Sequence, residues 1–218
     1  NFTNIFKNKL VMFDMFIVFE GIDGCGKSTQ VWKLAKYISE LSKYNHILVT
    51  REPYKARDIR KILKSEEDPY SQKERLTELF IQDRKEHIQD LIQPNLNKDI
   101  IVISDRYKYS TICYQSAQGQ NIEYLIEKQK DFLVPDFVFI INTEVSTAIN
   151  RMKKDLREEE QKFEKNKEFL EKVRQNYLKM PETFPDEKII IINGEKNIEE
   201  IFKDIKKYFQ KGLKTLFA

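Results

Sequence analysis

The sequence is poor in glycine, cysteine, histidine and tryptophan. Its 218 residues include 6 glycines, 2 cysteines, 2 histidines and 1 tryptophan, where an average composition would give about 15 glycines. Because Cys25 and Cys113 form neither a CxxC pair nor a Cys/His cluster, we expect no disulfide framework and no zinc site, and a reducing cytoplasm is the natural compartment. No apolar run approaches the roughly 18 residues of a membrane span, so no membrane partner is expected.

The charge is nearly balanced, and the apolar content is enough for a core. With 38 basic and 35 acidic residues the net charge is +3, which is too small to predict nucleic-acid binding. Fifteen Phe and ten Tyr residues supply apolar mass, so we expect one folded domain over residues 15–210. Residues 1–14 are predicted to be an N-terminal extension without the features of a signal peptide, and residues 211–218 a C-terminal tail.

Short apolar runs alternate with helical patterns along this domain. A capping box at Ser71–Glu74 is predicted to open a long helix, and Pro94 to stop it. Strands that are apolar throughout and separated by helices predict an α/β fold, a parallel sheet covered by helices on both faces. The predicted strands are 16–19, 46–49, 100–103, 137–141 and 189–192, and the predicted helices are 28–41, 56–63, 71–92, 110–117, 122–133, 145–179 and 198–209.

Half of the glycines stand together in one phosphate-binding pattern. Residues 21–28 fit G-x-x-x-x-G-K-[ST], between the first strand and the first helix. Glycines let successive N–H groups point at phosphate oxygens, and the helix N-terminus favours the same anion. Lys27 is predicted to reach the β- and γ-phosphates of a nucleoside triphosphate. The predicted ATP-binding residues are Gly21, Ile22, Asp23, Gly24, Cys25, Gly26, Lys27, Ser28 and Thr29.

A second polar position completes the pattern. The Ser28 hydroxyl is typical of a Mg²⁺ ligand in such loops. Asp105 follows the strand at 100–103, and it would deliver a carboxylate beside the metal. We therefore predict a Mg²⁺ site at Ser28 and Asp105, and ATP as the nucleotide.

Further segments indicate which kind of molecule accepts the phosphoryl group. The guanine-reading pattern of GTPases is absent, because Ile100 stands where Asn97-Lys-Asp would need a following carboxylate. Phe80 and Arg84 are four residues apart and so share one face of a predicted helix. A ring that stacks on a base beside a guanidinium that bonds its edge makes a plausible nucleobase reader, although a core Phe80 and a surface Arg84 fit the pattern too. Arg106 suits an anionic phosphate.

Taken jointly, these motifs resemble the thymidylate kinase family. The resemblance rests on Phe19-Glu-Gly-Ile-Asp-Gly-Cys-Gly-Lys-Ser-Thr29, Thr50-Arg-Glu-Pro53, Leu79-Phe80 with Asp83-Arg84, and Asp105-Arg-Tyr107 with Ser110 and Tyr114-Gln115, in the family's order and spacing. It implies a P-loop NTPase fold with a five-stranded parallel sheet and a short lid at about 153–165. It also implies Mg²⁺-dependent phosphoryl transfer from ATP to dTMP, and a homodimer.

The resemblance also assigns roles to residues. Phe80 would stack on thymine, Arg84 would bond its edge, and Tyr114 would exclude a ribose 2′-hydroxyl. Asp23 would lie by the sugar and the reacting phosphates. The dTMP-binding residues it implies are Arg51, Glu52, Pro53, Phe80, Arg84, Arg106, Ser110, Tyr114 and Gln115.

An arginine that meets the transferring phosphoryl group can raise the rate by about 10³- to 10⁵-fold. Members of the family that the sequence resembles carry this arginine either in the phosphate loop or in the lid. The phosphate loop has no arginine between Gly21 and Lys27, so the resemblance implies that the lid supplies it, and Arg151 and Arg157 are the candidates. The predicted catalytic residues are Lys27, Arg106, Asp23, Arg157 and Arg151. One departure from the family is Tyr54-Lys55, where paired glycines are common. Kinases acting on dUMP or dCMP, and a non-catalytic nucleotide-binding regulator, are the alternatives.

Overall fold

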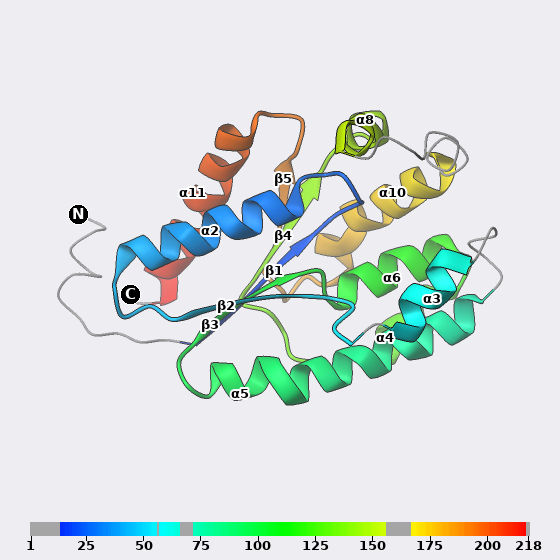
Figure 1. The fold of residues 1–218 in the computed structure, drawn as a ribbon, viewed down its shortest axis with the longest axis horizontal. Coiled ribbons are helices and arrows are strands. Elements are labelled where there is room, and N and C mark those ends of the chain that lie inside the picture. Colours follow the sequence, from blue (N-terminus) through cyan, green and yellow to red (C-terminus); the bar gives the residue numbers. More distant parts are fainter. Residues whose placement is uncertain (1–13, 56, 66–71, 156–166, 217–218) are drawn as a thin grey trace.

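The computed structural model of the chain describes residues 14–55, 57–65, 72–155 and 167–216. Its centre is a sheet of five strands in the order β2-β3-β1-β4-β5, every neighbouring pair of which is parallel (Figure 1). All five predicted strands are confirmed, with small shifts at their ends. The strands are β1 (Met15–Glu20), β2 (Ile47–Arg51), β3 (Ile101–Asp105), β4 (Phe137–Asn142) and β5 (Ile189–Asn193).

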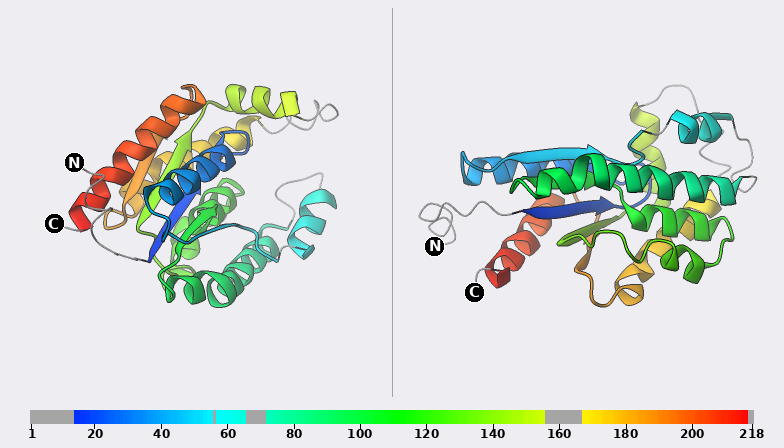
Figure 2. Two further views of the ribbon diagram at one scale, coloured as in Figure 1. Left: turned by 60° about the vertical axis from the view of Figure 1, so that its left-hand side comes forward. Right: turned by 90° about the horizontal axis from the view of Figure 1, so that it is seen from below.

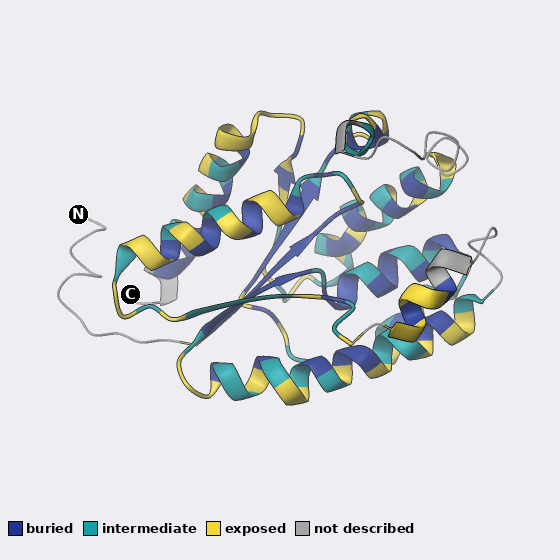
Figure 3. Ribbon diagram, in the orientation of Figure 1, coloured by how far each residue is buried: buried dark blue, intermediate teal, exposed yellow. Residues whose placement is uncertain are grey.

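Helices surround this sheet (Figure 2). All six residues of β1 are buried, which requires cover on both faces of the sheet. Figure 3 shows the central strands β1, β3 and β4 as the buried centre of the fold, whereas β2 at the edge is only half-buried. The predicted α/β class is therefore confirmed. The helices are α2 (Lys27–Leu41), α3 (Arg57–Ser65), α4 (Lys73–His87), the π-helical turn η1 (Ile88–Ile92), α5 (Gln93–Leu96), α6 (Lys108–Ala117), α7 (Ile122–Glu127), α8 (Val145–Asp155), α10 (Lys167–Thr183) and α11 (Ile198–Leu216).

The parallel register brings the C-terminal ends of three strands to one edge of the sheet. Asp105, at the end of β3, is level with Phe19 of β1 on one side and with Arg51 of β2 on the other. The segment between β1 and α2 leaves the sheet at this edge. In open α/β sheets such an edge is where ligands bind.

Pro94 does not end the long helix, contrary to the prediction. The helix continues from α4 through η1 and α5 as far as Leu96. A proline inside a helix lacks an N–H and collides with the carbonyl four residues earlier. The wider turn of η1 relieves this conflict, because the Gln93 N–H bonds to the Ile88 carbonyl five residues back. At its start, α4 has Gln72 in the N-cap position, so the predicted capping box is wrong in register; Ser71 lies outside the described residues.

Other helices also differ from the prediction. α7 ends at Glu127 rather than near residue 133, and the chain after it tightens through a bond from the Gln129 N–H to the Ile126 carbonyl three residues back. α11 continues to Leu216 and so includes part of the predicted tail. A Cβ at Gly212 would collide with the Phe137 ring, so glycine lets α11 lie close to β4. The predicted helix over 145–179 corresponds to α8 and α10, and residues 156–166 lie outside the described part.

Candidate active site

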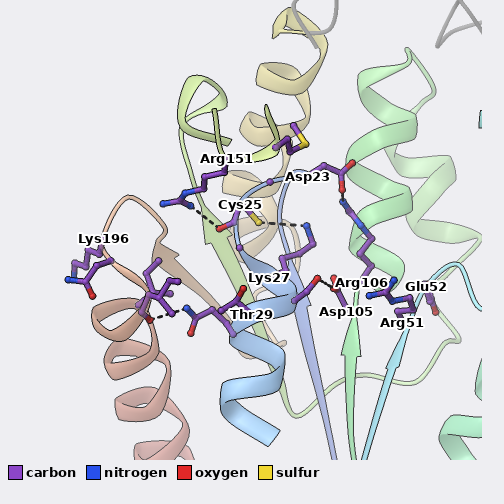
Figure 4. Close-up of a pocket in the computed structure, with 18 of the residues that line it drawn as sticks. Asp23, Cys25, Lys27, Thr29, Arg51, Glu52, Asp105, Arg106, Arg151 and Lys196 are labelled. Atoms are coloured by element: carbon purple, nitrogen blue, oxygen red, sulfur yellow. Dashed lines mark hydrogen bonds and ion pairs between the residues drawn. The ribbon is translucent and has the colours of Figure 1, made fainter. Parts of the chain in front are cut away.

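An open cavity of about 1180 Å³ lies at the C-terminal edge of the sheet. Residues 23–30 of the phosphate loop and α2 form its floor. Figure 4 shows Lys196 and Arg151 on one side of this loop and Arg51, Glu52 and Arg106 on the other. The cavity thus has two arms that meet at the end of β1, which is the arrangement that two nucleotides exchanging a phosphoryl group require.

The phosphate loop joins β1 directly to α2, as the motif predicts. Gly21, Gly24 and Gly26 have φ values of 137°, 77° and 97°, in the left-handed region that favours glycine. At Gly24 a Cβ would also collide with the carbonyl oxygen of Ala148 in α8. The loop is therefore packed against the helix that leads into the predicted lid.

Lys27, the first residue of α2, is folded back over the loop. Its Nζ donates to the carbonyl oxygens of Gly21 at 3.0 Å and Ile22 at 2.9 Å, and the side chain is buried. The side chain of Cys25 is fully buried, and its Sγ is 3.7 Å from the same ammonium group. Phosphate oxygens in the cavity would replace the two carbonyl acceptors and bind the ammonium more strongly, because hydrogen bonds between two ionised groups are stronger.

Ser28 and Asp105 meet across the sheet edge, as the prediction of a shared site requires. The Ser28 Oγ donates to Asp105 Oδ2 at 2.6 Å, although the two residues are 77 positions apart. Both are hard oxygen donors, the type that Mg²⁺ prefers. Within the described ranges, no group of three or more His, Cys, Asp and Glu side chains could hold a metal unaided. Mg²⁺ at this position would therefore depend on ligands from the nucleotide phosphates.

Arg106 follows β3 in a strained backbone conformation. Its φ of 79° is uncommon for a residue with a Cβ and costs about 1–2 kcal/mol. The Arg106 N–H donates to the Phe19 carbonyl at 2.9 Å, and its own carbonyl accepts from the Ser104 hydroxyl at 2.7 Å. These two bonds hold the strained conformation and direct the side chain into the cavity. Such strain is common at functional sites.

The guanidinium of Arg106 connects the phosphate loop to α6 and α10. Nη2 donates to Asp23 Oδ1 at 2.6 Å and to the Tyr114 hydroxyl at 3.3 Å, and Nη1 donates to the Ser110 Oγ at 2.8 Å and to the Tyr177 hydroxyl at 3.3 Å. The nearby positive charge of Arg106 lowers the pKa of the Asp23 carboxyl. The predicted residues Asp23, Arg106, Ser110 and Tyr114 are thus brought together.

Arg84 is buried in an ionic cluster and is not the surface residue of the alternative reading. Only 1% of it is exposed. Nε and Nη2 donate to Glu52 Oε2 at 2.9 and 2.5 Å, Nη2 also donates to Thr111 Oγ1 at 3.0 Å, and Nη1 donates to Gln129 Oε1. These bonds use four of the five N–H groups, and Arg84 is not among the residues that line the cavity, so its predicted bond to a base stays a prediction.

Phe80 and Gln115 lie beside this cluster and not in the wall of the cavity. The half-buried Phe80 packs against Ile59, Ile62 and Leu76 between α3 and α4. The buried Gln115 side chain donates from Nε2 to the Lys73 carbonyl at 3.1 Å. Their predicted contacts with thymine stay predictions, since the residues between α3 and α4 lie outside the described chain.

The loop after β2 is held to α4 by Asp83, which belongs to one of the sequence motifs, and by His87, which no motif singled out. The Asp83 carboxylate accepts from the backbone N–H groups of Tyr54 at 2.5 Å and Lys55 at 2.7 Å. His87, fully buried, contacts Glu52 through Nδ1 at 3.2 Å, and its ring stacks on Tyr54 with centroids 4.7 Å apart. These contacts explain how the chain accommodates Tyr54-Lys55: the loop is held to α4 through its backbone and through the Tyr54 ring.

Of the two candidate lid arginines, the structure describes only Arg151. Its Nη1 donates to the Cys25 carbonyl at 3.3 Å and its Nη2 to the Gly194 carbonyl at 2.9 Å. Arg151 therefore connects the phosphate loop to the segment after β5. Arg157 lies outside the described residues, as does most of the predicted lid.

Several cavity residues escaped the sequence analysis. Arg60 of α3 and the segment Lys196-Asn197 before α11 line the cavity. Arg60 could have been noticed as a second cation near Arg51, but no local pattern singles out the others. No helix in the described ranges is long and apolar enough to cross a membrane.

The site combines a phosphate loop at the end of the central strand, a carboxylate at the end of β3, and a cavity arm lined by Arg51, Arg60 and Arg106. Together these features define a P-loop kinase. A family model for thymidylate kinases matches residues 19–205. The chain therefore belongs to the thymidylate kinase family, and the resemblance seen in the sequence is confirmed.

Individual relatives agree with this assignment. The chain is 37% identical over 200 residues to a probable thymidylate kinase of Thermococcus kodakarensis, covering 88% of this chain and 95% of the relative. It is 37% identical over 202 residues to a thymidylate kinase of Fervidobacterium nodosum, covering 89% and 98%. The crystal structure of thymidylate kinase from Ehrlichia chaffeensis matches with a TM-score of 0.70 and 30% identity, over 91% of this chain and 99% of that one.

Proposed function

We propose that this protein is a thymidylate kinase, which transfers the γ-phosphoryl group of ATP to dTMP and yields ADP and dTDP. The main support is the cavity that places Lys27 and Ser28 between an arm ending at Arg151 and an arm carrying Arg106 and Arg51. ATP would occupy the first arm and dTMP the second. The membership in the family supports the same reaction.

The chain's own residues would act by positioning and by charge neutralisation, which are the main sources of catalysis in phosphoryl transfer. Lys27 and the N–H groups of the loop would hold the β- and γ-phosphates. Arg106 would hold the phosphate of dTMP, and the Asp23 carboxylate would orient the guanidinium by accepting from Nη2 at 2.6 Å. Arg51 and Arg60 add positive charge to the same arm. An oxygen of the dTMP phosphate would form a bond to the γ-phosphorus. The bond between the γ-phosphorus and the β,γ-bridging oxygen would break, and ADP would leave.

Mg²⁺ fits the pair formed by Ser28 and Asp105. The Ser28 Oγ is near enough to Asp105 to share a hydrated ion with it. When bound, the ion would neutralise charge that develops on the β- and γ-phosphate oxygens.

The reaction can be tested by measuring ADP release with ATP, Mg²⁺ and dTMP, dUMP or dCMP as acceptor. We expect turnover with dTMP, much slower turnover with dUMP and dCMP, and loss of turnover when EDTA removes the metal. Nucleotide binding without ADP release would support a regulator instead. Faster turnover with dUMP or dCMP would assign a different acceptor.

Phe80 can be tested against a neighbour in the same apolar cluster. Stacking of a base on an aromatic ring contributes about 1–3 kcal/mol, so Phe80→Ala is expected to weaken dTMP binding by about 5- to 150-fold. ATP binding should be nearly unchanged. Leu79 packs against the same cluster, so Leu79→Ala serves as the control that loses packing but keeps the ring. Calorimetric titration with each nucleotide measures both affinities, and equal losses in the two variants would contradict the stacking role.

The oligomeric state and the location of the protein are proposed as well. The family resemblance implies a homodimer, which light scattering after gel filtration would measure directly. A cytoplasmic location is supported by the two cysteines, both buried and both free, since thiols of this kind persist in a reducing compartment. Fractionation of the source cells would test the location.

A further inference from the structure

The carboxylate of Glu20 is fully buried at the end of β1, immediately before the phosphate loop. Oε1 accepts from the backbone N–H groups of Tyr107 at 2.7 Å and Ser110 at 3.2 Å, both at the start of α6. Oε2 accepts from the hydroxyls of Ser110 at 2.6 Å and Tyr177 at 2.9 Å. Burying a carboxylate costs desolvation free energy even when four donors surround it, so the position of Glu20 calls for a functional explanation.

The same two hydroxyls are the acceptors for Arg106. Its Nη1 donates to the Ser110 Oγ at 2.8 Å and to the Tyr177 hydroxyl at 3.3 Å. Each hydroxyl has a single hydrogen and lone pairs on its oxygen. The two hydroxyl oxygens are also 2.9 Å from each other, where either could donate. When both hydrogens are instead donated to the charged Glu20 carboxylate, the stronger acceptor, only lone pairs are left to face the guanidinium.

We propose that Glu20 is a positioning residue that orients Ser110 and Tyr177 as acceptors for Arg106 and so fixes this arginine on the acceptor phosphate. The negative charge of Glu20 also balances the guanidinium through the two hydroxyls. This inference rests on the proposed function, because it assumes that Arg106 holds the phosphate of dTMP.

The isosteric variant Glu20→Gln is the direct test. The amide oxygen would still accept from the two N–H groups of α6. The amide nitrogen would replace Oε2 and, as a donor, would turn both hydroxyl hydrogens away from it. Because only one hydroxyl can donate to the other, at least one hydrogen would then compete with the N–H groups of Arg106. Losing acceptors for a charged group weakens its placement, so we expect the KM for dTMP to rise by about tenfold or more and kcat to fall by about tenfold. The affinity for ATP should stay within about twofold, because the phosphate loop is unchanged.

Glu187→Gln is the matched control. The Glu187 carboxylate anchors the same helix α6, through Lys108 at 2.5 Å and through the Tyr109 hydroxyl, but it bonds to none of the acceptors of Arg106. Loosened anchoring of α6 alone would change both variants alike. A loss of dTMP affinity in Glu20→Gln, with Glu187→Gln near wild type, would support the positioning role.

Tyr177→Phe provides a second readout that does not depend on Glu20→Gln being well folded. It removes one acceptor and should raise the KM for dTMP in the same direction, by a smaller factor. If both residues act through Arg106, the double variant should be little worse than Glu20→Gln. Kinetic constants of Glu20→Gln within twofold of wild type, or fully additive effects, would overturn the inference. A wild-type protein that releases no ADP with dTMP would overturn the proposed function instead.

Discussion

Replacing Lys27 with methionine is expected to lower kcat by about 10²- to 10³-fold, the range found when one preorganised donor to a developing charge is removed. Methionine keeps most of the length of the side chain but carries no charge. The ammonium of Lys27 lies 3.0 and 2.9 Å from the Gly21 and Ile22 carbonyls, at the floor of the cavity where the two nucleotide arms meet. Its charge is therefore available to the transferring phosphoryl group. Coupled measurement of ADP release with saturating ATP and dTMP gives the comparison.

Lys36→Met is the control for this variant. Lys36 belongs to the same helix α2, but its side chain is 77% exposed and its nearest carboxylate, that of Glu40, is 3.9 Å away. An exposed pair of this kind contributes little to stability, so turnover and thermal midpoint should be unchanged. Turnover by Lys27→Met close to that of Lys36→Met would show that Lys27 has no part in the transfer step.

What could be predicted from the sequence was set by interactions that are local in the chain. The phosphate loop follows from eight consecutive residues, because the glycines, the lysine and the helix start act within one turn. The contact between Ser28 and Asp105 spans 77 positions, yet it could also be predicted, because parallel strands bring their C-terminal ends to one edge.

The contacts within the buried ionic cluster of Glu52, Arg84 and His87 could not be predicted from the sequence. Arg84 and His87 contact Glu52 across 32 and 35 positions, and both side chains are buried. A basic residue in the last turn of a helix is normally read as exposed. Only the packing of the loop after β2 onto α4 makes the interior the favourable place for these polar side chains. The same limit applies to Arg106, because one of the two bonds that hold its strained φ is made to Phe19 of β1, which is distant in the sequence.

The end of the long helix at Leu96 illustrates a different limit. A proline rule based on the α-helix predicts a stop at Pro94. The chain instead opens one π-helical turn before the proline and continues. Whether a helix breaks or widens at a proline depends on what the next turn can bury, and Ile92 and Leu96 are both buried in the core.

Arg157→Ala is expected to lower kcat by about 10³-fold or more with little change in the KM for dTMP, since an arginine that meets the transferring phosphoryl group acts mainly in the transition state. Arg157 lies outside the described residues, and the expectation rests on the absence of an arginine between Gly21 and Lys27 and on the contacts of Arg151.

Both ends of the Arg151 guanidinium are bonded to backbone carbonyls, those of Cys25 and Gly194. Removing the Arg151 side chain should therefore loosen the arm of the cavity that is proposed to bind ATP.

For Arg151→Ala we accordingly expect a rise in the KM for ATP of about 10- to 100-fold, the cost of one or two hydrogen bonds from a charged donor, and a smaller loss of kcat. Arg157→Lys separates charge from geometry, because lysine keeps the charge but lacks the planar fork that binds two phosphate oxygens at once. It should recover only part of the lost rate. Steady-state kinetics with each substrate varied in turn measures all three variants. If Arg157→Ala turned over normally while Arg151→Ala lost about 10³-fold in kcat, the catalytic role would belong to Arg151, and its two carbonyl contacts would have to break when ATP binds.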